Sequence, residues 1–478
     1  MAILNKYTKY LIIGLMLLMP ILDTKFFYSR ITTLFIVLYI FVILLLTLYN
    51  NKKSHKSFKF LFIYYLLCFG YLILNYFHSK GFTSLFPNDF NYSLLSEFTT
   101  ILKLMMPFTL LFVLKYNDID KKNYYLIIKY WILFISLSII ITNIFKSSIS
   151  SYGDSTIMYN IFEWKNNLYY TLTASKGFFN YANQEACIMI MLLVIAVYMF
   201  FEKNKKNIIY IILLTISMIM LGTRVSTLGG LLTLTFTSIF ILIFKLINKQ
   251  KIKKEYLLIF VPVIIWGLLL PISPYSNRNI ELNDKTININ YNDDSKNIDK
   301  KESQVNCLSK EEKMMKYVDE NHDENRMPEL FYKQYYSYEN DPDFWYSFVK
   351  KYQPYEINYR LMEISIIKRI NEIDDRNTNI LFGISNSRIQ NVVNIERDFV
   401  LHYYAFGIIG MIILLLVYPF ILIKKIMEII REKNELYNYI MLFIITLFII
   451  CSILTVNILN SFTPIIPLIF IVHKNTKD

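Results

Sequence analysis

Long hydrophobic runs separated by short polar connections recur along the chain of 478 residues. A membrane-spanning helix needs about 20 mostly apolar residues. Runs of this kind occupy 10–28, 31–49, 60–78, 97–114, 125–145, 184–201, 207–222, 225–244, 256–272, 399–423, 438–458 and 461–473. The pattern predicts an all-α polytopic membrane protein with about 12 transmembrane helices.

Lysine residues mark one side of this predicted membrane protein, because cytoplasmic connections carry an excess of basic residues. If the chain starts inside, every lysine-rich short connection falls on the same side. These connections contain Lys52, Lys53, Lys56 and Lys59; Lys115, Lys121 and Lys122; Lys203, Lys205 and Lys206; Lys245, Lys249, Lys251, Lys253 and Lys254; and Lys424, Lys425, Arg431 and Lys433. We therefore expect both termini in the cytoplasm.

Two hydrophilic segments then fall on the outer side. One is a loop at 146–182, and the other, at 273–397, is long enough to form a domain between the ninth and tenth helices. Aromatic residues and a helical spacing of isoleucines in the second half of this domain predict that it is largely helical. The expected division of the chain is helices one to nine in 1–272, an extracytoplasmic domain in 273–397 and the last three helices in 398–478.

Composition agrees with this prediction and changes how the charge is interpreted. The chain is 55% hydrophobic and 18% charged, which argues against a water-soluble enzyme. Its net charge of +13 would suggest nucleic-acid binding in a soluble protein, but residues 273–397 carry −4 and the remainder +17. The excess therefore reports membrane topology, and no nucleic acid is expected as a partner. The four cysteines are too scattered for a metal cluster or a disulfide framework, and we expect no metal or cofactor.

Arginines are distributed differently from lysines. Only Arg431 falls on the inner side; the others are Arg30, Arg224, Arg278, Arg326, Arg360, Arg369, Arg376, Arg388 and Arg397. The planar guanidinium matches phosphate and carboxylate groups with two hydrogen bonds, so an outward set suggests an anionic ligand. The alternative for most of them is pairing with the many carboxylates of the same domain.

Three polar elements at predicted membrane borders could carry chemistry. The first is the turn Gly222-Thr223-Arg224, where an arginine stands between two apolar runs; it faces a wet cavity or a partner, or extends to the interface. The second is 177–185, at the start of the sixth helix, whose amides either cap the helix or bind a ligand. The third is 396–410, in which Asp398 and His402 share one helical face; they bind a ligand or each other.

The order of these elements resembles the O-antigen ligase and Wzy-type polymerase superfamily of bacterial membrane glycosyltransferases. The family's Gly-x-Phe-x-x-x-Asn stretch matches 177–183, and its Ser-Arg-Gly-like turn matches Thr223-Arg224. An outer-domain arginine followed by a Gly-x-Gly/Ser region matches Arg360 and 383–385. The closing motif, which starts with histidine in the family, matches 396–410, but here Glu396 takes the place of that histidine.

This resemblance implies transfer of a glycan from an undecaprenyl-diphosphate-linked oligosaccharide to a glycan acceptor, at the outer face of the bacterial cytoplasmic membrane. The product would be capsule, O-antigen or wall polysaccharide, and the reaction would use no metal, no cofactor and no nucleotide sugar. Implied partners are the donor, the acceptor, the lipid bilayer and other polysaccharide-assembly proteins. Polymerase and ligase remain alternatives. A polytopic transporter or flippase of lipid-linked oligosaccharide is the rival function, because the number of spans suits it equally.

The residues receive roles on this hypothesis. Arg224 and Arg360 hold the diphosphate and stabilise its developing charge, while Glu396 or Asp398 handles the attacking hydroxyl. The predicted substrate-binding residues are Asn180, Asn183, Gln184, Arg388, Arg397 and His402. Asp341-Pro342-Asp343 spells the Asp-x-Asp of metal-dependent glycosyltransferases, but its proline and its loop setting favour a turn.

Overall fold

The computed structural model describes residues 2–85, 91–163, 169–280, 309–322, 327–352, 357–392, 395–455 and 457–473. Every regular element among them is helical, which confirms the all-α fold class. Arg326 and Cys307 lie outside the described residues, as do parts of the predicted outer loop and of the predicted domain. The chain divides into two units. Unit 1 comprises Met1–Leu66, Leu102–Glu281 and Leu415–Asp478, and unit 2 comprises Leu67–Ile101 and Leu282–Leu414.

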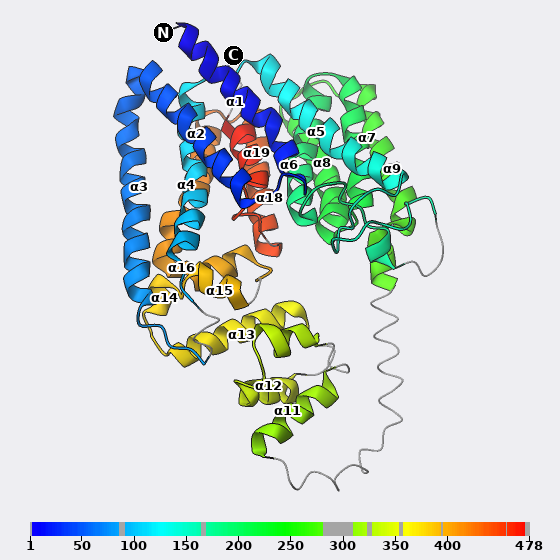
Figure 1. Cartoon of the computed structure of the whole chain (residues 1–478). Coiled ribbons are helices and arrows are strands. Elements are labelled where there is room, and N and C mark those ends of the chain that lie inside the picture. The colour runs from blue at the N-terminus through cyan, green and yellow to red at the C-terminus, as the bar shows by residue number, and fades with distance from the viewer. Residues whose placement is uncertain are drawn as a thin grey trace. The chain divides into compact units, whose positions relative to one another are not determined.

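Unit 1 consists mainly of long apolar helices, and Figure 1 shows both chain termini at the same end of it. Its helices are α1 (Ala2–Leu22), α2 (Arg30–Asn50), α5 (Lys121–Ile144), α6 (Ala182–Glu202), α7 (Ile208–Leu221), α8 (Gly230–Ile247), α9 (Phe260–Leu269), α17 (Val417–Arg431), α18 (Leu436–Leu454) and α19 (Phe462–His473). Short 3-10 or π turns are η1 (Tyr170–Leu172), η2 (Lys205–Asn207), η3 (Val225–Gly229), η4 (Lys254–Ile259) and η5 (Leu270–Ile272). Helices α3 (Lys52–Ser79) and α4 (Leu94–Tyr116) contribute to both units.

Helix α6 is the centre of unit 1. Nineteen of its 21 residues are buried, so it has no face left for solvent or lipid. Helices α7, α8, α18 and α19 pack against it. A helix that is apolar on all sides is expected in the core of a bundle, and the run from Ala186 to Val197 satisfies that condition.

The connections of unit 1 gather at two ends. At the lysine-rich end, Lys205 Nζ lies 2.7 Å from Glu255 Oε1, and Lys245 pairs with Glu202. At the other end, the Lys25 N–H donates to the Phe178 carbonyl over 2.8 Å. We call the second end the loop end; it comprises residues 23–29, 145–163, 169–181, 222–224 and 457–461. Connections that are distant in sequence therefore meet at the ends of the bundle.

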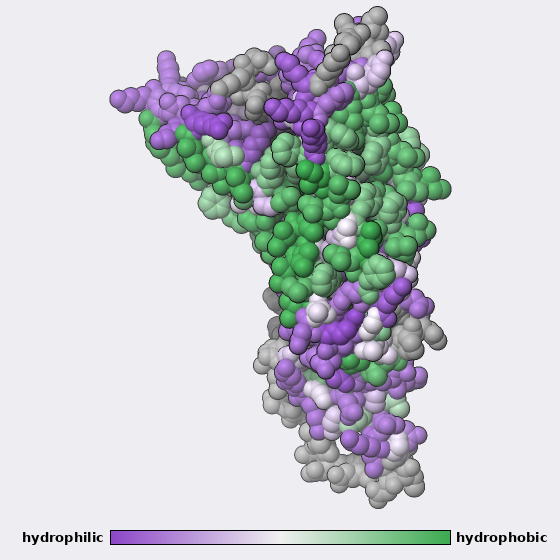
Figure 2. Space-filling model, turned by 90° about the vertical axis from the view of Figure 1, so that its left-hand side faces the viewer, coloured by the Kyte–Doolittle hydropathy of each residue, from purple (hydrophilic) through white to green (hydrophobic). Residues whose placement is uncertain are grey.

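Nine helices in the described part of the chain are long and apolar enough to cross a membrane. They are Arg30–Asn50, Lys53–Ser79, Leu94–Tyr116, Lys121–Ile144, Ala182–Glu202, Val225–Ile247, Lys254–Ile280, Asp398–Arg431 and Leu436–Leu454. Leu38 and Leu45 of α2 are each 64% exposed, and Figure 2 shows a broad band of hydrophobic residues on one face of the molecule. Such a surface suits a lipid bilayer. The number of twelve helices stays a prediction.

Unit 2 contains shorter helices packed around aromatic side chains. They are α11 (Lys310–Asn321), η7 (Leu330–Tyr335), α12 (Pro342–Lys351), α13 (Tyr359–Asp374), α14 (Asn379–Phe382), α15 (Asn386–Val392) and α16 (Asp398–Leu414). Asp341 caps α12 by accepting the Phe344 N–H, and both of its oxygens also accept bonds from Arg369, at 2.8 and 3.2 Å. The Asp-Pro-Asp sequence is therefore a helix cap whose first carboxylate is already occupied.

Helix α16 is interrupted at Gly407, whose φ of 60° lies in the left-handed region. The segment after Gly383 runs against the interruption: the Ile384 and Ser385 N–H groups donate to the Tyr404 and Ala405 carbonyls at 2.8 and 3.0 Å.

A side chain from α3 completes this contact. The Tyr71 hydroxyl lies 2.9 Å from the Phe382 carbonyl and 2.8 Å from the Phe406 carbonyl. The Asn75 side chain also donates to the Phe382 carbonyl, over 3.0 Å. The backbone groups released by the break are thus paired inside the protein, as a membrane environment demands.

We predict that Gly407→Ala and Gly383→Ala destabilise unit 2. A Cβ would lie 2.4 Å from the Leu381 backbone at the first position and 2.3 Å from the Ala405 carbonyl oxygen at the second, and the positive φ values add about 1–3 kcal/mol of strain. Gly70→Ala on α3 is the matched control, since its Cβ meets no atom within 4 Å. Thermal unfolding of the purified variants should show a much lower midpoint temperature for Gly407→Ala and Gly383→Ala than for Gly70→Ala. Equal midpoint temperatures of the three variants would contradict the contact.

Candidate functional site

An ion pair joins two of the predicted catalytic residues within unit 2. Arg360, in the first turn of α13, places its Nε 3.2 Å from Glu396 Oε2. The two side chains keep 41% and 43% of their surface exposed. Exposed pairs contribute only about 0–1 kcal/mol to stability. The pair is therefore accessible, and a ligand can replace either partner at low cost to the fold.

A third acidic side chain lies directly behind this pair. Glu363, one helical turn after Arg360, is only 4% exposed and accepts the backbone N–H of Glu396 over 3.0 Å. Burial raises the pKa of the Glu363 carboxyl to about 8, although the Glu396 N–H and the charges of Arg360 and Arg397 act in the opposite direction. Glu363 is thus a protonated acid at neutral pH that holds the backbone of Glu396.

The sequence analysis did not identify Glu363, although a signal was present. Glu363 shares the buried face of α13 with Ile366, Ile367 and Ile370. A carboxylate within an apolar helical stripe is costly unless it is neutral or paired. That position is therefore a recognisable exception to the amphipathic pattern.

Arg397 differs from the other arginines of unit 2. It is half-buried, and no carboxylate among the described residues forms an ion pair with it. Its charge nevertheless acts on Glu363. A guanidinium in this condition has unused donors, which is what binding of an anion requires.

Asp398 and His402 lie at the start of α16 and are both fully buried. The His402 Nδ1 lies 2.5 Å from the Asp398 carbonyl oxygen. Because a carbonyl only accepts, Nδ1 carries the proton in this contact. The two residues are one helical turn apart, as the sequence predicted. In this contact His402 binds the backbone carbonyl of Asp398.

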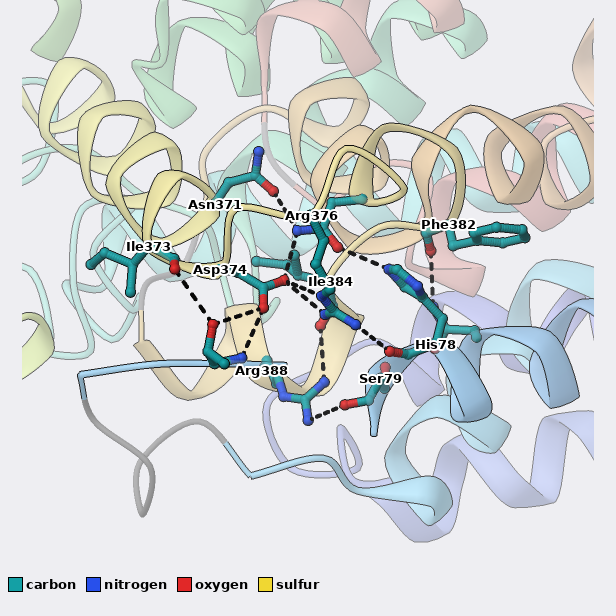
Figure 3. A network of polar contacts seen from close by, with 12 residues as sticks. His78, Ser79, Asn371, Ile373, Asp374, Arg376, Phe382, Ile384 and Arg388 are labelled. Carbon is teal, nitrogen blue, oxygen red and sulfur yellow. Dashed lines mark hydrogen bonds and ion pairs between the residues drawn. The ribbon is translucent and has the colours of Figure 1, made fainter. Parts of the chain in front are cut away.

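Arg388 binds the last residue of α3, as Figure 3 shows. Its Nη2 donates to the Ser79 carbonyl over 3.0 Å, and its guanidinium lies 4.3 Å from the centre of the Phe82 ring. Arg376 binds the neighbouring His78 carbonyl and pairs with Asp374. The last carbonyls of a helix lack intrahelical partners and attract cations. These two arginines therefore anchor the α3 end in unit 2.

Arg224 lies at the loop end of unit 1, in the turn between α7 and η3. Gly222 ends α7 with a φ of 68°. The Thr223 and Ser226 side chains then bind each other's backbone N–H groups, at 3.1 and 3.0 Å, and fix the turn. The Arg224 side chain is exposed, and no described carboxylate forms an ion pair with it.

Tyr152 links this turn to a second arginine, which the sequence analysis placed only among the outward set. The Tyr152 hydroxyl donates to the Gly222 carbonyl over 2.9 Å and accepts from Arg278 Nη1 over 3.0 Å. Burial raises the pKa of Tyr152, while the charges of Arg278 and Arg224 oppose that rise. We call Tyr152, Arg224 and Arg278 the basic group of unit 1.

The amides at the start of α6 have different surroundings. Gln184 is buried, donates to the Asn457 carbonyl over 3.0 Å and accepts from Ser461 over 3.1 Å. Asn183 is half-buried at the helix start, and the Asn180 backbone N–H donates to the Asp23 carbonyl. Gln184 therefore joins α6 to the connection before α19, while Asn180 and Asn183 retain partly exposed side chains.

Residues 4–474 match the family model for the O-antigen ligase like membrane protein. The chain belongs to this family. No curated protein and no solved structure matches the chain. The match confirms the resemblance inferred from the motifs, and it extends over both units. This O-antigen ligase-like chain is accordingly a multi-pass membrane protein whose family implies ligation or polymerisation of glycans.

We predict that the protonation of Glu363 makes stability depend on pH. The unfolded chain releases this proton near pH 4.5 and the folded chain near pH 8, so the folded state binds more protons between these values. The free energy of unfolding should therefore fall as pH rises through this window, by an amount on the order of a few kcal/mol. Glu363→Gln should remove that component, as denaturation at pH 5 and pH 8.5 would show.

Infrared spectroscopy gives an independent check of the same group. The wild-type protein at pH 7 should show the carbonyl band of a neutral carboxylic acid that is missing in Glu363→Gln. Glu372→Gln, an exposed position on the same helix, is the control. Identical spectra of wild type and Glu363→Gln at pH 7 would contradict the assignment.

Proposed function

We propose that this protein transfers glycan repeat units from a polyprenyl-diphosphate carrier to an acceptor hydroxyl at the outer face of the cytoplasmic membrane. The observation that carries the proposal is the basic group of unit 1, in a chain of a glycan ligase family. Arg278 contacts the hydroxyl and the ring of Tyr152, the charge of Arg224 also acts on this tyrosine, and no described carboxylate forms an ion pair with either arginine. Such a group suits a diphosphate, which arginine recognises with parallel hydrogen bonds.

The proposed step is a displacement at the anomeric carbon of the donor sugar. The acceptor oxygen forms the new glycosidic bond while the bond from that carbon to the diphosphate oxygen breaks. The leaving polyprenyl diphosphate takes the electron pair, and Arg224 stabilises the negative charge that develops on it, while Arg278 contributes to binding of the donor. Removal of one such donor typically costs about 10²–10³ in rate.

The proton of the acceptor hydroxyl passes to Glu396 in this proposal. Its carboxylate is accessible and is oriented by the Arg360 guanidinium. Glu363 is a positioning residue, because it fixes the backbone of Glu396 from the buried side. Arg360 and Arg397 add positive charge near this carboxylate, and Asp398 remains the alternative proton acceptor.

The substrates follow from the same proposal. The donor is an oligosaccharide on undecaprenyl diphosphate, the acceptor is another glycan, and the termini lie in the cytoplasm with the lysine-rich connections. Polymerase and ligase use the same donor and differ in the acceptor. Analysis of the product separates them: a ladder of repeat units indicates a polymerase, and a single addition to a different molecule indicates a ligase.

We predict that Arg224→Ala and Glu396→Gln each lower kcat/KM for glycan transfer by about 10²–10³-fold. The assay uses purified protein in lipid discs with the lipid-linked donor, and measures longer glycan and released carrier diphosphate. Arg431→Ala, an exposed arginine at the lysine-rich end, and Glu372→Gln on α13 are the matched controls. Wild-type transfer by a correctly inserted Arg224→Ala or Glu396→Gln would refute the assigned role.

A further variant tests the residue that only the structure connects to Arg224. Arg278→Gln should raise KM for the diphosphate donor about tenfold and weaken the dependence of KM on salt, because one guanidinium charge is lost. Tyr152→Phe keeps both arginines and should have a smaller effect. An Arg278→Gln enzyme with unchanged KM at low and high salt would exclude Arg278 from the donor site.

A further inference from the structure

A small, partly open polar cleft lies at the loop end of unit 1 and has no role in the proposal so far. Side chains of α1, α2, α4 and the segment before α19 line it. The polar residues that matter here are Asp23, Tyr28, Thr33, Lys103, Asn460 and Ser461. Polar walls at the border of an apolar helix bundle indicate a place where polar groups enter the protein.

Two acidic residues meet beside this cleft. Asp23, which lines it, is 2% exposed, and Glu185 of α6 is 1% exposed. The two carboxyl groups interact with each other at short range, and the Thr463 hydroxyl donates to Asp23. Two adjacent buried carboxyls cannot both be ionised at moderate cost, so the pair shares one proton and keeps one negative charge.

The remaining groups of the cleft define the chemistry of its occupant. The Asn460 Oδ1 is buried and accepts no hydrogen bond from the described residues. Lys103 lines the cleft from α4, and no described carboxylate forms an ion pair with it. The occupant must therefore supply donors to Asp23 and Asn460 and an acceptor to Lys103.

Charged occupants fit this set poorly. The charge of the acid pair repels a phosphate or other anion, and the Lys103 ammonium repels a small cation such as Na⁺. A neutral polyol satisfies both, because each hydroxyl donates one hydrogen bond and accepts others. Tyr28, 41% exposed and in edge contact with Tyr181 at 5.6 Å, supplies an aromatic wall for the apolar face of a ring.

We propose that this cleft is a glycan subsite of unit 1 that holds one sugar ring. Asp23 and Asn460 accept hydrogen bonds from ring hydroxyls, and Lys103 donates one to a ring or hydroxyl oxygen. The proposal rests on the proposed function in one respect only: the bound sugar ring is assumed to belong to the glycan substrate. Glu185 acts through Asp23, by sharing its proton, and is a positioning residue.

The test measures binding of a free oligosaccharide to the full-length protein in lipid discs. The probe is the tritium-labelled repeat unit released by mild acid from the host's lipid carrier, so that no diphosphate is present. Asp23→Asn should weaken binding at least tenfold, because a hydrogen bond to a charged acceptor is roughly twice as strong as a neutral one. Asp154→Asn is the control: it lies at the same end, is 80% exposed and is paired with Lys25.

A second variant keeps the test valid if Asp23→Asn fails to fold. Thr33→Phe fills the cleft from α2 without altering the acid pair and should also abolish binding. Arg224→Ala should bind the free oligosaccharide as wild type does while losing transfer. Failure of the subsite and failure of the proposed function therefore give different results.

The subsite is wrong if Asp23→Asn and Thr33→Phe both bind the oligosaccharide with wild-type affinity. It is also wrong if the wild-type protein does not bind the probe, whether or not it catalyses transfer. Saturable binding of ²²Na⁺ that is lost in Asp23→Asn, with oligosaccharide binding unchanged, would replace the sugar by a cation and overturn the proposal.

Discussion

The backbone contact between Gly383 and Gly407 is the constraint on which unit 2 depends. It interrupts α16 and pairs the released carbonyls with the 383–385 segment and with Tyr71 of α3. Neither position accepts a Cβ, because the opposing backbone would lie 2.3–2.4 Å away. Helix α16 begins at Asp398, two residues after Glu396, whose backbone Glu363 holds from α13. The glycines of two family-like motifs thus have one physical explanation, namely close approach of two chain segments.

Arginines serve two separate purposes in this protein. Arg369, Arg376 and Arg388 bind a buried carboxylate or the carbonyls at a helix end, so they support the fold. Arg224 and Arg397 have no described ion-pair partner, which leaves their donors available for a ligand. Sorting arginines by partner, not by their side of the membrane, therefore separates structural residues from candidate binding residues.

Hydrophobic periodicity predicted the helices well, because each apolar run specifies a local structure. The sequence names candidate site residues, such as Arg224 in its turn and Glu396 before α16, but it does not show which side chains surround them. Glu363 behind Glu396, Arg278 beside Tyr152 and Glu185 against Asp23 are contacts between distant segments. Local sequence does not encode such contacts, although a carboxylate within an apolar stripe marks Glu363 and Glu185 as exceptions. The pairing of Arg388 with the α3 end is likewise a product of packing.

The central claim is that the chain exchanges a glycosidic bond, and does not carry an intact lipid-linked glycan. The most direct measurement follows donor labelled in both sugar and diphosphate, with purified protein in sealed vesicles. Transfer predicts that the two labels separate, with sugar appearing in a longer glycan or a new acceptor and phosphate remaining in free polyprenyl diphosphate. Movement of both labels across the bilayer in one intact molecule, with no separated product, would contradict the account and indicate a transporter.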